Sequence, residues 1–431
     1  RGDEMLDLKF IRDNKDIVKE AIKNRGYKID IDELIRLDEE HRNILAEVEG
    51  LRAQRNKAND EITAIMKVKG NPKEIIAKMK PISQKIADFE EKVEEIVQKI
   101  DKIRYIIPNI PDKSLPVGGP ECNKIVKSWG KTPDFEFKPK THIELAEILD
   151  IICFGVAAKI TGSNFILYKG LGARLERALI NFMLDLHTKK HGYTEIFPPF
   201  LVNRRSMTGT GQLPKLEEDM YRLKDEDLFL IPTAEVPVTN IHAGDILEES
   251  QLPIRYTAYS ACFRREAGSY GKDTRGLVRV HQFNKVELVK FVKPETSFDE
   301  LEKLLNDAEE VLQLLELPYR VVMLATGDIS FAAAKCYDIE LYAAGVDTYL
   351  EVSSCSCFTD FQARRANIRF KRITNDKRRT TEYVHTLNGS GVALPRLVVA
   401  IMENYQNKDG SVRIPKALIP YMDGLEVIKS R

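Results

Sequence analysis

Two runs of side chains between Phe263 and Phe291 have the types and spacing needed to bind an anion that carries a flat ring. Arginine binds phosphate oxygens through two parallel N–H groups, and a phenylalanine ring stacks on a base. Read as an extended strand, the second run alternates between two faces. One face is chemically active and the other is apolar: Arg279, His281, Phe283, Lys285 and Glu287 against Val278, Val280, Val286 and Leu288. These groups suit a purine nucleotide such as ATP.

The first run, Phe263 to Glu266, alternates in the same way, so that Arg264 and Glu266 point together. We therefore expect two antiparallel strands joined by a basic, glycine-rich loop, with arginines, carboxylates and one aromatic ring around a single cavity. The sequence contains no GxxxxGKS or GxxxxGKT loop that would cradle phosphates instead. An exposed amphipathic hairpin with solvated charges is the alternative that these residues leave open.

The order of these residues resembles motif 2 of the class II aminoacyl-tRNA synthetases, in the form found in the seryl enzymes of the bacterial type. The matching stretches are FRREAG at 263–268 and RGLVRVHQFNKVE at 275–287. The resemblance implies an α+β fold, in which a catalytic domain is built on an antiparallel β-sheet flanked by helices. It also implies that this domain binds ATP and L-serine.

Two further segments gain meaning from this resemblance. If Pro232 to Glu235 is extended, Thr233 and Glu235 share one face. In the family this segment lines the amino-acid pocket. The glycine-rich segment 207–221 matches a family loop beside the active site, although an ordinary surface turn would explain its glycines equally well.

The segment from Asp338 to Ser356 alternates apolar residues and then presents a carboxylate followed by hydroxyls. Oxygen ligands of this kind suit magnesium, which bridges nucleotide phosphates. The resemblance places Glu351 and Ser354 on that metal. Strict alternation would put these two residues on opposite faces of a strand, so the assignment requires a bend or a bulge.

The segment from Leu387 to Gln406 reads as a glycine-rich turn that opens an amphipathic helix, and it resembles motif 3. An arginine early in a helix adds its charge to the field of the helix N-terminus, where anions bind. A capped helix with a solvated arginine is the alternative. The chain departs from the usual family pattern at Ala343-Ala344 and at Cys357, which leaves the local shape of the pocket open.

The resemblance implies a role for each matching residue. Catalytic roles fall to Arg264 and Arg396, at the α- and γ-phosphates of ATP. The predicted serine-binding residues are Thr233, Ala234, Glu235, Arg264, Glu287 and Ser390. The predicted ATP-binding residues are Arg264, Arg265, Glu266, Val280, Phe283, Glu351, Val352, Ser353, Ser354 and Arg396. The implied cofactor is Mg²⁺, which enters with ATP.

Two long helical stretches precede these motifs. Apolar residues recur every three or four positions from Leu34 to Ile65 and again from Ile75 to Ile103, and Gly70-Asn71-Pro72 separates the two series. Heptad patterns of this kind predict an antiparallel coiled coil, because the break is only long enough for a reversal. About 35 residues of helix would give an arm of about 50 Å.

Charge is sorted along this predicted arm. Residues 51–85 contain nine basic and three acidic residues, whereas residues 30–50 and 86–102 are predominantly acidic. A basic tip suits the phosphate backbone of folded RNA. A coiled coil that binds protein or only dimerises is the alternative, but the resemblance implies an arm that contacts the long variable arm of tRNA(Ser). The predicted tRNA-binding residues are Arg52, Arg55, Lys57, Lys67, Lys69, Lys73, Lys78 and Lys80.

These patterns divide the chain into an N-terminal tRNA-binding domain at 5–108 with its arm at about 31–103, a proline-rich linker at 109–120, and a class II catalytic domain at 121–431. Thr141 to Glu144 predicts a capping box for a helix that runs to about Ile160. A helix from Leu171 to His191 and the edge segment 193–202 resemble motif 1, which implies a homodimer.

Composition limits the alternatives. The 431 residues carry 66 basic and 66 acidic side chains, so nucleic-acid binding must come from local charge separation. No apolar run approaches the length of a membrane span. The six cysteines include no CxxC pair, so we expect reduced thiols in a cytoplasmic protein and no structural zinc.

The leading hypothesis is a serine–tRNA ligase that forms seryl-adenylate from L-serine and ATP and transfers the seryl group to tRNA(Ser), with tRNA(Sec) as a further candidate. A ligase that loads serine onto a carrier protein, and an inactive paralogue that binds RNA, are the alternatives. The long arm argues against the first of these, and the retained Arg264, Glu287, Glu351 and Arg396 argue against the second.

Overall fold

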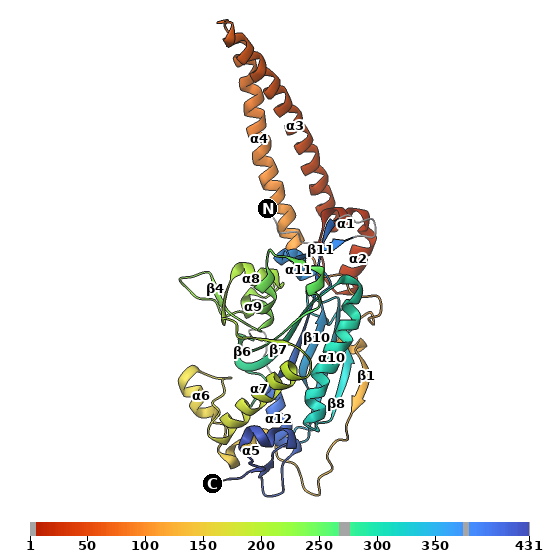
Figure 1. The fold of residues 1–431 in the computed structure, drawn as a ribbon, viewed down its shortest axis with the longest axis vertical. Coiled ribbons are helices and arrows are strands. Elements are labelled where there is room, and N and C mark those ends of the chain that lie inside the picture. Colours follow the sequence, from red (N-terminus) through yellow and green to blue (C-terminus); the bar gives the residue numbers. More distant parts are fainter. Residues whose placement is uncertain (1–5, 267–275, 374–378, 431) are drawn as a thin grey trace. The chain divides into compact units, whose positions relative to one another are not determined.

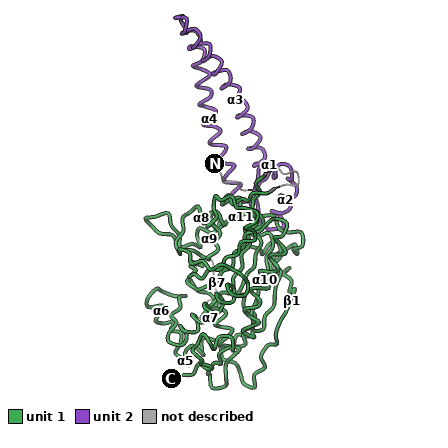
Figure 2. Tube along the Cα trace, viewed as in Figure 1, with its two compact units in different colours: residues 1–4, 109–431 green, residues 5–108 purple. Residues whose placement is uncertain are grey.

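The computed structural model describes residues 6–266, 276–373 and 379–430. The chain forms two compact units, the smaller one at Met5–Pro108 and the larger one built on Asn109–Arg431 (Figure 2). The central loop of the predicted nucleotide hairpin, residues 267–275, lies outside the described residues. No helix in the described part of the chain is both long enough and apolar enough to cross a membrane.

The smaller unit is entirely helical where it is described (Figure 1). Its helices are α1 (Leu8–Asp13), α2 (Lys15–Asn24), α3 (Ile31–Lys67) and α4 (Lys73–Tyr105). The side chain of Asp30 caps α3 by accepting a hydrogen bond from the backbone N–H of Glu33. The chain reverses at Gly70-Asn71-Pro72, and α3 and α4 pack antiparallel, as the sequence predicts.

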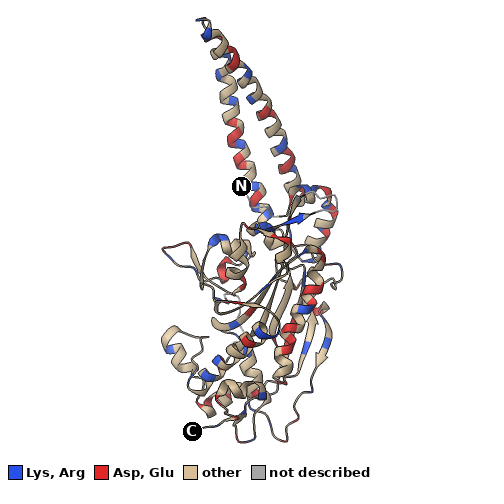
Figure 3. Ribbon diagram, in the orientation of Figure 1, with Lys and Arg blue, Asp and Glu red and all other residues tan. Residues whose placement is uncertain are grey.

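The contact between α3 and α4 follows the predicted apolar seams. The buried seam residues are Leu34, Val48, Ala58, Ile86, Ile96 and Ile100. Basic residues are spread along both helices toward the turn that joins them (Figure 3). An exposed ion pair between Arg52 and Glu90, at 2.6 Å, links the two helices across the seam.

The larger unit is built on an eight-stranded sheet. All its strand pairs are antiparallel except β2–β6, which is parallel. In spatial order the strands are β1 (Lys124–Trp129), β8 (Tyr319–Met323), β9 (Lys335–Ala343), β10 (Thr348–Cys357), β13 (His385–Ala393), β7 (Gln282–Val292), β6 (Ile254–Phe263) and β2 (Thr194–Ile196).

Smaller sheets and helices surround this sheet. The other strands are β5 (Ile246–Glu248), β11 (Arg369–Ile373) and β12 (Arg379–Tyr383) in one sheet, β14 (Val412–Arg413) with β15 (Val427–Ile428), and β3 (Leu201–Asn203) with β4 (Leu228–Leu230). The α-helices are α5 (His142–Leu149), α6 (Phe154–Thr161), α7 (Leu171–Lys189), α8 (Arg204–Gly209), α9 (Glu235–Thr239), α10 (Ser297–Leu314), α11 (Phe361–Ala366) and α12 (Leu394–Asn404). Short 3₁₀ helices lie at Pro120–Cys122, Glu217–Asp219, Asn240–His242, Glu249–Gln251, Pro294–Thr296 and Lys416–Met422.

The two faces of the large sheet have different partners. Helices α7, α10 and α12 pack on one face and enclose the main apolar core (Figure 1). Val286 and Leu288 of β7 point into that core, whereas Phe283 and Lys285 of the same strand line a cavity on the opposite face. The predicted alternation of β7 is therefore confirmed, although the strand begins at Gln282 and residues 276–281 form turns and bends.

Two local predictions were wrong, and the extended conformation considered for 232–235 is not adopted. The helix expected from Thr141 to Ile160 is divided into α5 and α6, because Asp150 adopts a left-handed conformation (φ 53°) after the confirmed capping box. Pro232 to Glu235 is a turn that opens α9, since the Thr233 hydroxyl accepts a hydrogen bond from the N–H of Glu235 at 3.2 Å. The predicted glycine-rich turn before α12 is strand β13, paired with both β7 and β10.

Gly389 shows why a glycine-rich segment can be a central strand here. A Cβ atom at this position would lie 2.4 Å from Leu304 Cδ2 of α10 and 3.0 Å from Cys355 Sγ of β10. The absence of a side chain therefore lets α10 approach the sheet closely. The neighbouring residues Asn388 and Ser390 point to the other face and line the cavity.

Candidate active site

A cavity of about 630 Å³ lies on the sheet face opposite the main core. Strands β7, β10 and β13 form its floor, and the segment 210–220 with residues 330–332 forms part of its wall. Twelve of the predicted serine- and ATP-binding residues line it: Thr233, Glu235, Arg264, Glu266, Val280, Phe283, Glu351, Val352, Ser353, Ser354, Ser390 and Arg396. The fold thus gathers residues that are up to 163 positions apart in the chain around one space.

One end of the cavity carries a buried polar cluster around Thr233. The Thr233 hydroxyl donates a hydrogen bond to Glu287 Oε2 and accepts one from Lys285 Nζ, both at 2.8 Å. Lys285 also forms an ion pair with Glu287, and Asn388 Nδ2 donates to Glu287 Oε1 at 3.3 Å. This arrangement fixes a carboxylate and an ammonium group side by side in a site that is almost closed to water.

A second carboxyl group, that of Glu235, is buried in the same end. Its Oε1 accepts a hydrogen bond of 2.6 Å from Gln362 Nε2. Gln362 is itself fully buried, and its side-chain oxygen accepts from the Thr386 hydroxyl at 2.8 Å. Burial, and next the negative charge of Glu287, raise the pKa of Glu235 to about 7. The cluster can therefore present one or two negative charges to a cationic group near neutral pH.

Arg264 and Phe283 occupy the middle of the cavity. The Arg264 guanidinium lies 5.3 Å from the centre of the Phe283 ring, and its Nε donates to Pro232 O at 3.4 Å. Backbone pairing sets this geometry, because Arg264 N–H donates to His281 O at 2.8 Å where β6 and β7 diverge. A guanidinium over an aromatic ring in one cavity provides a partner for a phosphate and a ring on which a flat base can stack.

The predicted bulge in β10 is present. The register with β9 shifts between Glu351 and Ser353, which leaves Val352 as the additional residue. This extra residue lets Glu351 and Ser354 both line the cavity, and the Val352 side chain packs against the main core at the cavity floor. In an unbroken strand, Glu351 and Ser354 would face opposite sides. With the bulge, both can contribute oxygen atoms to one metal site.

Asp338 of β9 lies beside this pair and was not predicted. Its register partner across the ladder is Ser354. Burial, and next the charge of Glu351, raise the pKa of Asp338 to about 8. The described residues contain no group of three or more His, Cys, Asp or Glu side chains arranged around a metal. One carboxylate and one hydroxyl on the same face nevertheless fit a cation that keeps most of its ligands as water and phosphate.

Arg396 projects from the first turn of α12 toward β10. Its Nη1 donates to Glu351 O at 2.6 Å, and its Nε donates to Val278 O at 3.1 Å. The side chain therefore joins strand β10 to the turn segment that contains Val278, and it places its charge next to Glu351, 3.6 Å from Oε2. This position near a helix N-terminus is favourable for an anion.

Three predicted residues do not line the cavity. Glu287 lies one layer behind it and acts through Thr233 and Lys285. Ala234 packs in a separate apolar cluster with Ala258 and Val289. The Arg265 side chain is exposed, and its backbone N–H donates to Asp219 O at 2.9 Å.

Several lining or supporting residues were missed. Lys285 shares the active face of β7 in the sequence pattern, but that pattern does not distinguish a pocket lysine from a solvated one. Gln362 and the wall residues Phe331 and Ala332 carry no sequence signal, because only the tertiary fold brings them to the site. The eight predicted tRNA-binding residues all lie in the smaller unit, where Arg55 is half-buried and the others are exposed.

Comparison with known proteins identifies both units. Residues 218–405 match the model of the tRNA synthetase class II core domain (G, H, P, S and T), and residues 5–111 match the model of the seryl-tRNA synthetase N-terminal domain. A serine–tRNA ligase of Trichlorobacter lovleyi is 58% identical over 425 residues, which cover 98% of this chain and all of that protein. This chain belongs to the seryl-tRNA synthetase family.

Other members of the seryl-tRNA synthetase family agree over the whole length. The serine–tRNA ligase of Geotalea uraniireducens is 56% identical over 98% of this chain and all of that protein. The crystal structure of seryl-tRNA synthetase from Pyrococcus horikoshii complexed with ATP has a TM-score of 0.90 and 41% identity, and the match covers 99% of this chain and all of that one. The fold class predicted from sequence, a class II synthetase core with a long N-terminal helical hairpin, is confirmed.

Proposed function

We propose that this protein is a serine–tRNA ligase, which joins L-serine to ATP to form seryl-adenylate and pyrophosphate and then transfers the seryl group to the 3′ end of tRNA(Ser). One observation is the main support for the proposed reaction. A single cavity combines the buried Thr233–Lys285–Glu287 cluster at one end with Arg264, Phe283, Glu351 and Arg396 at the other. Full-length relatives that are named serine–tRNA ligases support the choice of amino acid and acceptor.

The buried end of the cavity binds serine in this proposal. The ammonium group of serine pairs with Glu235, and Glu287 adds its negative charge from behind Thr233 and Lys285. Thr233 and Ser390 line the same end of the cavity. Arg264 neutralises the serine carboxylate and directs it toward the α-phosphate. A pocket that hydrogen-bonds the serine hydroxyl disfavours alanine by about 10⁴, because alanine would leave buried polar groups unpaired.

The open end of the cavity binds ATP. Phe283 stacks on adenine, Arg264 contacts the α-phosphate and Arg396 contacts the γ-phosphate. The serine carboxylate attacks the α-phosphorus, pyrophosphate leaves, and the terminal ribose hydroxyl of tRNA then attacks the mixed anhydride. Both steps depend on positioning and charge neutralisation more than on a dedicated acid or base.

Glu351 and Ser354 hold Mg²⁺ in this proposal. The bulge at Val352 supports it, because that bulge turns both oxygen donors toward the cavity. When bound, the ion neutralises charge on the nucleotide phosphates. Arg396, already beside Glu351, orients the same phosphates from the other side.

The smaller unit recognises tRNA. We assign residues 5–108 to a tRNA-binding domain with its arm at 31–103, residues 109–120 to a linker and residues 121–431 to the catalytic domain. The basic residues 51–85 support phosphate contacts by the tip of the arm. We include tRNA(Sec) as a second acceptor and place the enzyme in the cytoplasm, where its tRNA substrates are used.

We propose that the protein works as a homodimer. Strand β2 is the last strand of the large sheet, and the adjacent Phe197 side chain is 77% exposed. An edge strand beside an exposed aromatic residue suits an interface between two copies. The Phe197→Asp variant should lower the mass measured by light scattering from that of two chains to that of one.

The decisive experiment separates the two half-reactions. It measures transfer of labelled serine to total tRNA, and serine-dependent exchange of pyrophosphate into ATP, in the presence of magnesium. The intact chain is compared with a variant in which a short linker replaces residues 31–103. We expect both activities in the intact chain and only the exchange activity in the variant.

Other outcomes would redirect the assignment. Exchange without charging in the intact chain would point to an acceptor other than tRNA. Loss of exchange in the intact chain would contradict the proposed chemistry altogether. Charging that persists without the arm would contradict the role of residues 31–103 but not the role of the cavity.

A further inference from the structure

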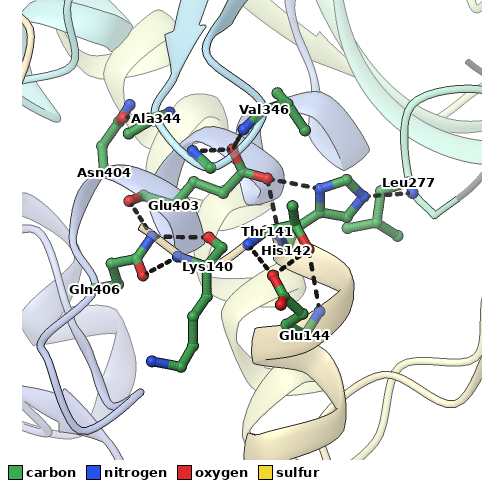
Figure 4. A network of polar contacts seen from close by, with 11 residues as sticks. Lys140, Thr141, His142, Glu144, Leu277, Ala344, Val346, Glu403, Asn404 and Gln406 are labelled. Carbon is green, nitrogen blue, oxygen red and sulfur yellow. Dashed lines mark hydrogen bonds and ion pairs between the residues drawn. The ribbon is translucent and has the colours of Figure 1, made fainter. Parts of the chain in front are cut away.

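Figure 4 shows a buried polar pair, His142 and Glu403, and neither residue lines the cavity. His142, the first residue of α5, donates from both its backbone N–H and its Nδ1 to Glu403 Oε1, each at 2.8 Å. Glu403 Oε2 accepts from the N–H groups of Gly345 and Val346 at 2.8 and 3.1 Å. Both side chains are at least 98% buried. Four donors on one carboxylate are the full complement that an ionised glutamate can use.

The second ring nitrogen of His142 has its own partner. The backbone N–H of Leu277 donates to His142 Nε2 at 3.2 Å (Figure 4). Because an N–H group can only donate, Nε2 must be unprotonated, and Nδ1 carries the hydrogen that Glu403 accepts. His142 is therefore a neutral bridge with a fixed tautomer between a carboxylate and a backbone amide.

This bridge joins three segments that each contribute to the ATP end of the cavity. Residues 277–280 line the cavity directly. Glu403 lies on α12, seven residues after Arg396, and Arg396 donates to the carbonyl of Val278. Helix α12 thus holds the same backbone segment at two points, through Arg396 at Val278 and through Glu403 and His142 at Leu277.

The same carboxylate also holds the turn between β9 and β10. Its contacts to Gly345 and Val346 are reinforced by Asn404, whose side chain accepts from Ala344 N–H and donates to Tyr342 O. Strand β10 begins directly after this turn and carries Glu351 and Ser354. A shift of the turn would move the oxygen donors that face the phosphates.

Gly276 shows that the approach of the 277–280 segment to His142 is close. It adopts a positive φ of 75°, and a Cβ atom there would lie 2.2 Å from His142 Nε2. A glycine at this position therefore allows the backbone to reach the imidazole.

We propose that His142 and Glu403 are positioning residues for ATP: they fix the 277–280 segment and the β9–β10 turn against α12, and so set the geometry of Arg396 and Glu351. This inference rests on the proposed function, because it assigns the ATP end of the cavity. The His142–Glu403 pair makes no contact with the Thr233–Lys285–Glu287 cluster, so it should affect ATP binding and not serine binding. Neither residue contacts substrate, so their loss should change ATP binding through Val278, Arg396 and β10.

The test uses two variants of the same residue. In His142→Asn the shorter amide can still donate to Glu403 but cannot reach Leu277, whereas in His142→Gln the longer side chain can present an oxygen to the Leu277 N–H. Glu403→Gln keeps the volume of Glu403 and removes its charge. Glu144→Ala, on the same helix, removes only the exposed capping box and serves as the matched control.

Serine-dependent pyrophosphate exchange gives KM for ATP and for serine separately, and thermal melting reports folding. We expect His142→Asn and Glu403→Gln to raise the KM for ATP at least about tenfold, the cost of one buried hydrogen bond, with the KM for serine within about twofold of the intact protein. His142→Gln should recover much of the ATP affinity, and Glu144→Ala should leave both constants unchanged.

Equal changes in both KM values, or a lower melting temperature with unchanged KM for ATP, would show a purely structural role and overturn the proposal. If His142→Asn does not fold, the comparison of His142→Gln with Glu403→Gln still decides it, because Glu403→Gln should weaken ATP binding far more than His142→Gln. An intact chain without exchange activity would instead indicate failure of the proposed function, so the two failures are distinguishable.

Discussion

Among the described residues of the larger unit, three carboxyl groups are buried deeply enough that burial is the first cause of a raised pKa. The pKa is raised to about 7 for Glu176 and Glu235 and to about 8 for Asp338. Glu235 lines one end of the candidate active site, and Asp338 is the register partner of Ser354, which lines the other end. Their partners decide how much negative charge each end presents to its substrate, so single substitutions around them should have specific effects.

Gln362 is expected to control serine binding through Glu235. Its amide donates to Glu235 at 2.6 Å while its oxygen is held by Thr386, so it fixes the carboxylate without touching the cavity. Gln362→Leu should raise the KM for serine about 10-fold to 100-fold, the usual cost of removing a hydrogen bond to a charged group, and leave the KM for ATP unchanged. Pyrophosphate exchange at saturating co-substrate measures both constants.

The Gln362→Glu variant gives a matched comparison with a different pH dependence. It places a second carboxyl group against Glu235, so the two groups must share a proton. The KM for serine should therefore fall with rising pH in both variants, but over a higher pH range in Gln362→Glu, because the two carboxyl groups release their shared proton later. Identical pH profiles for the two variants would show that Gln362 acts only by filling space.

Glu176 should make the stability of the larger unit depend on pH. Its pKa is raised from 4.5 to about 7, so the folded chain keeps a proton that the unfolded chain releases. The stabilisation is complete below about pH 4.5 and is lost as the pH rises to about 7, by about 3 kcal/mol in total. Glu176→Gln does not titrate and should melt at a higher temperature than the intact protein at pH 8, with a smaller difference at pH 5.

Glu147→Gln is the control for this measurement, because Glu147 is exposed on α5. Its melting temperature should follow that of the intact protein at every pH. A constant difference between Glu176→Gln and the intact protein from pH 5 to pH 8 would contradict the proposed proton uptake at Glu176.

At the scale of elements, the sequence was most informative where a period is long and regular. The seams of α3 and α4 and the alternation of β7 were predicted from spacing alone, because each pattern repeats over many residues. The bulge at Val352 was predicted only because Glu351 and Ser354 could not otherwise bind the same metal ion. The register shift between β9 and β10 confirms that the bulge exists.

The elements that were missed depend on contacts that sequence spacing does not contain. The helix predicted to Ile160 is interrupted where Gly172 lies so close that a Cβ atom would be 2.3 Å from Ile151 O. Strand β13 was read as a turn because its glycines lower local strand propensity, whereas pairing with two neighbouring strands outweighs that preference. In the same way, Gln362 enters the site only through the packing of α11.

Gly50 provides a test of α3 as an element. It lies inside the helix, and a Cβ atom there would meet nothing within 4 Å. Gly50→Ala should stabilise α3 by about 0.5–1 kcal/mol, because alanine loses less backbone entropy on helix formation. Slower amide hydrogen exchange around residue 50 in the intact chain would be the measured sign.

Gly70 is the matched control in the same pair of helices. A Cβ atom at Gly70 would lie 2.8 Å from Ile65 Cγ2, so Gly70→Ala should disturb the turn and speed exchange in the last turn of α3. Equal responses of the two variants would contradict the view that local space decides the outcome.

At the scale of the whole molecule, the two units use their charged residues differently. The chain has no net formal charge, yet residues 51–85 have an excess of six basic residues (nine basic minus three acidic). The chain as a whole is therefore only weakly attracted to nucleic acid, and the basic tip of the arm provides a local attraction. The catalytic unit instead buries its charges in pairs such as Lys285–Glu287, where they serve small substrates.

This separation predicts that reversing charge at the tip affects only the second half-reaction. In the triple variant Lys67→Glu, Lys69→Glu and Lys73→Glu, all three positions are exposed in the described structure. The KM for tRNA should rise at least about tenfold, and the slope of log KM against log salt should fall by about one unit for each phosphate that the arm no longer neutralises. Pyrophosphate exchange should be unchanged, since the cavity residues all lie beyond residue 209.

The same reversal at the exposed Lys408, Lys416 and Lys429 of the larger unit controls for net charge and should leave the salt slope intact. A similar loss of charging in both triple variants would mean that total charge, and not the arm, attracts the tRNA.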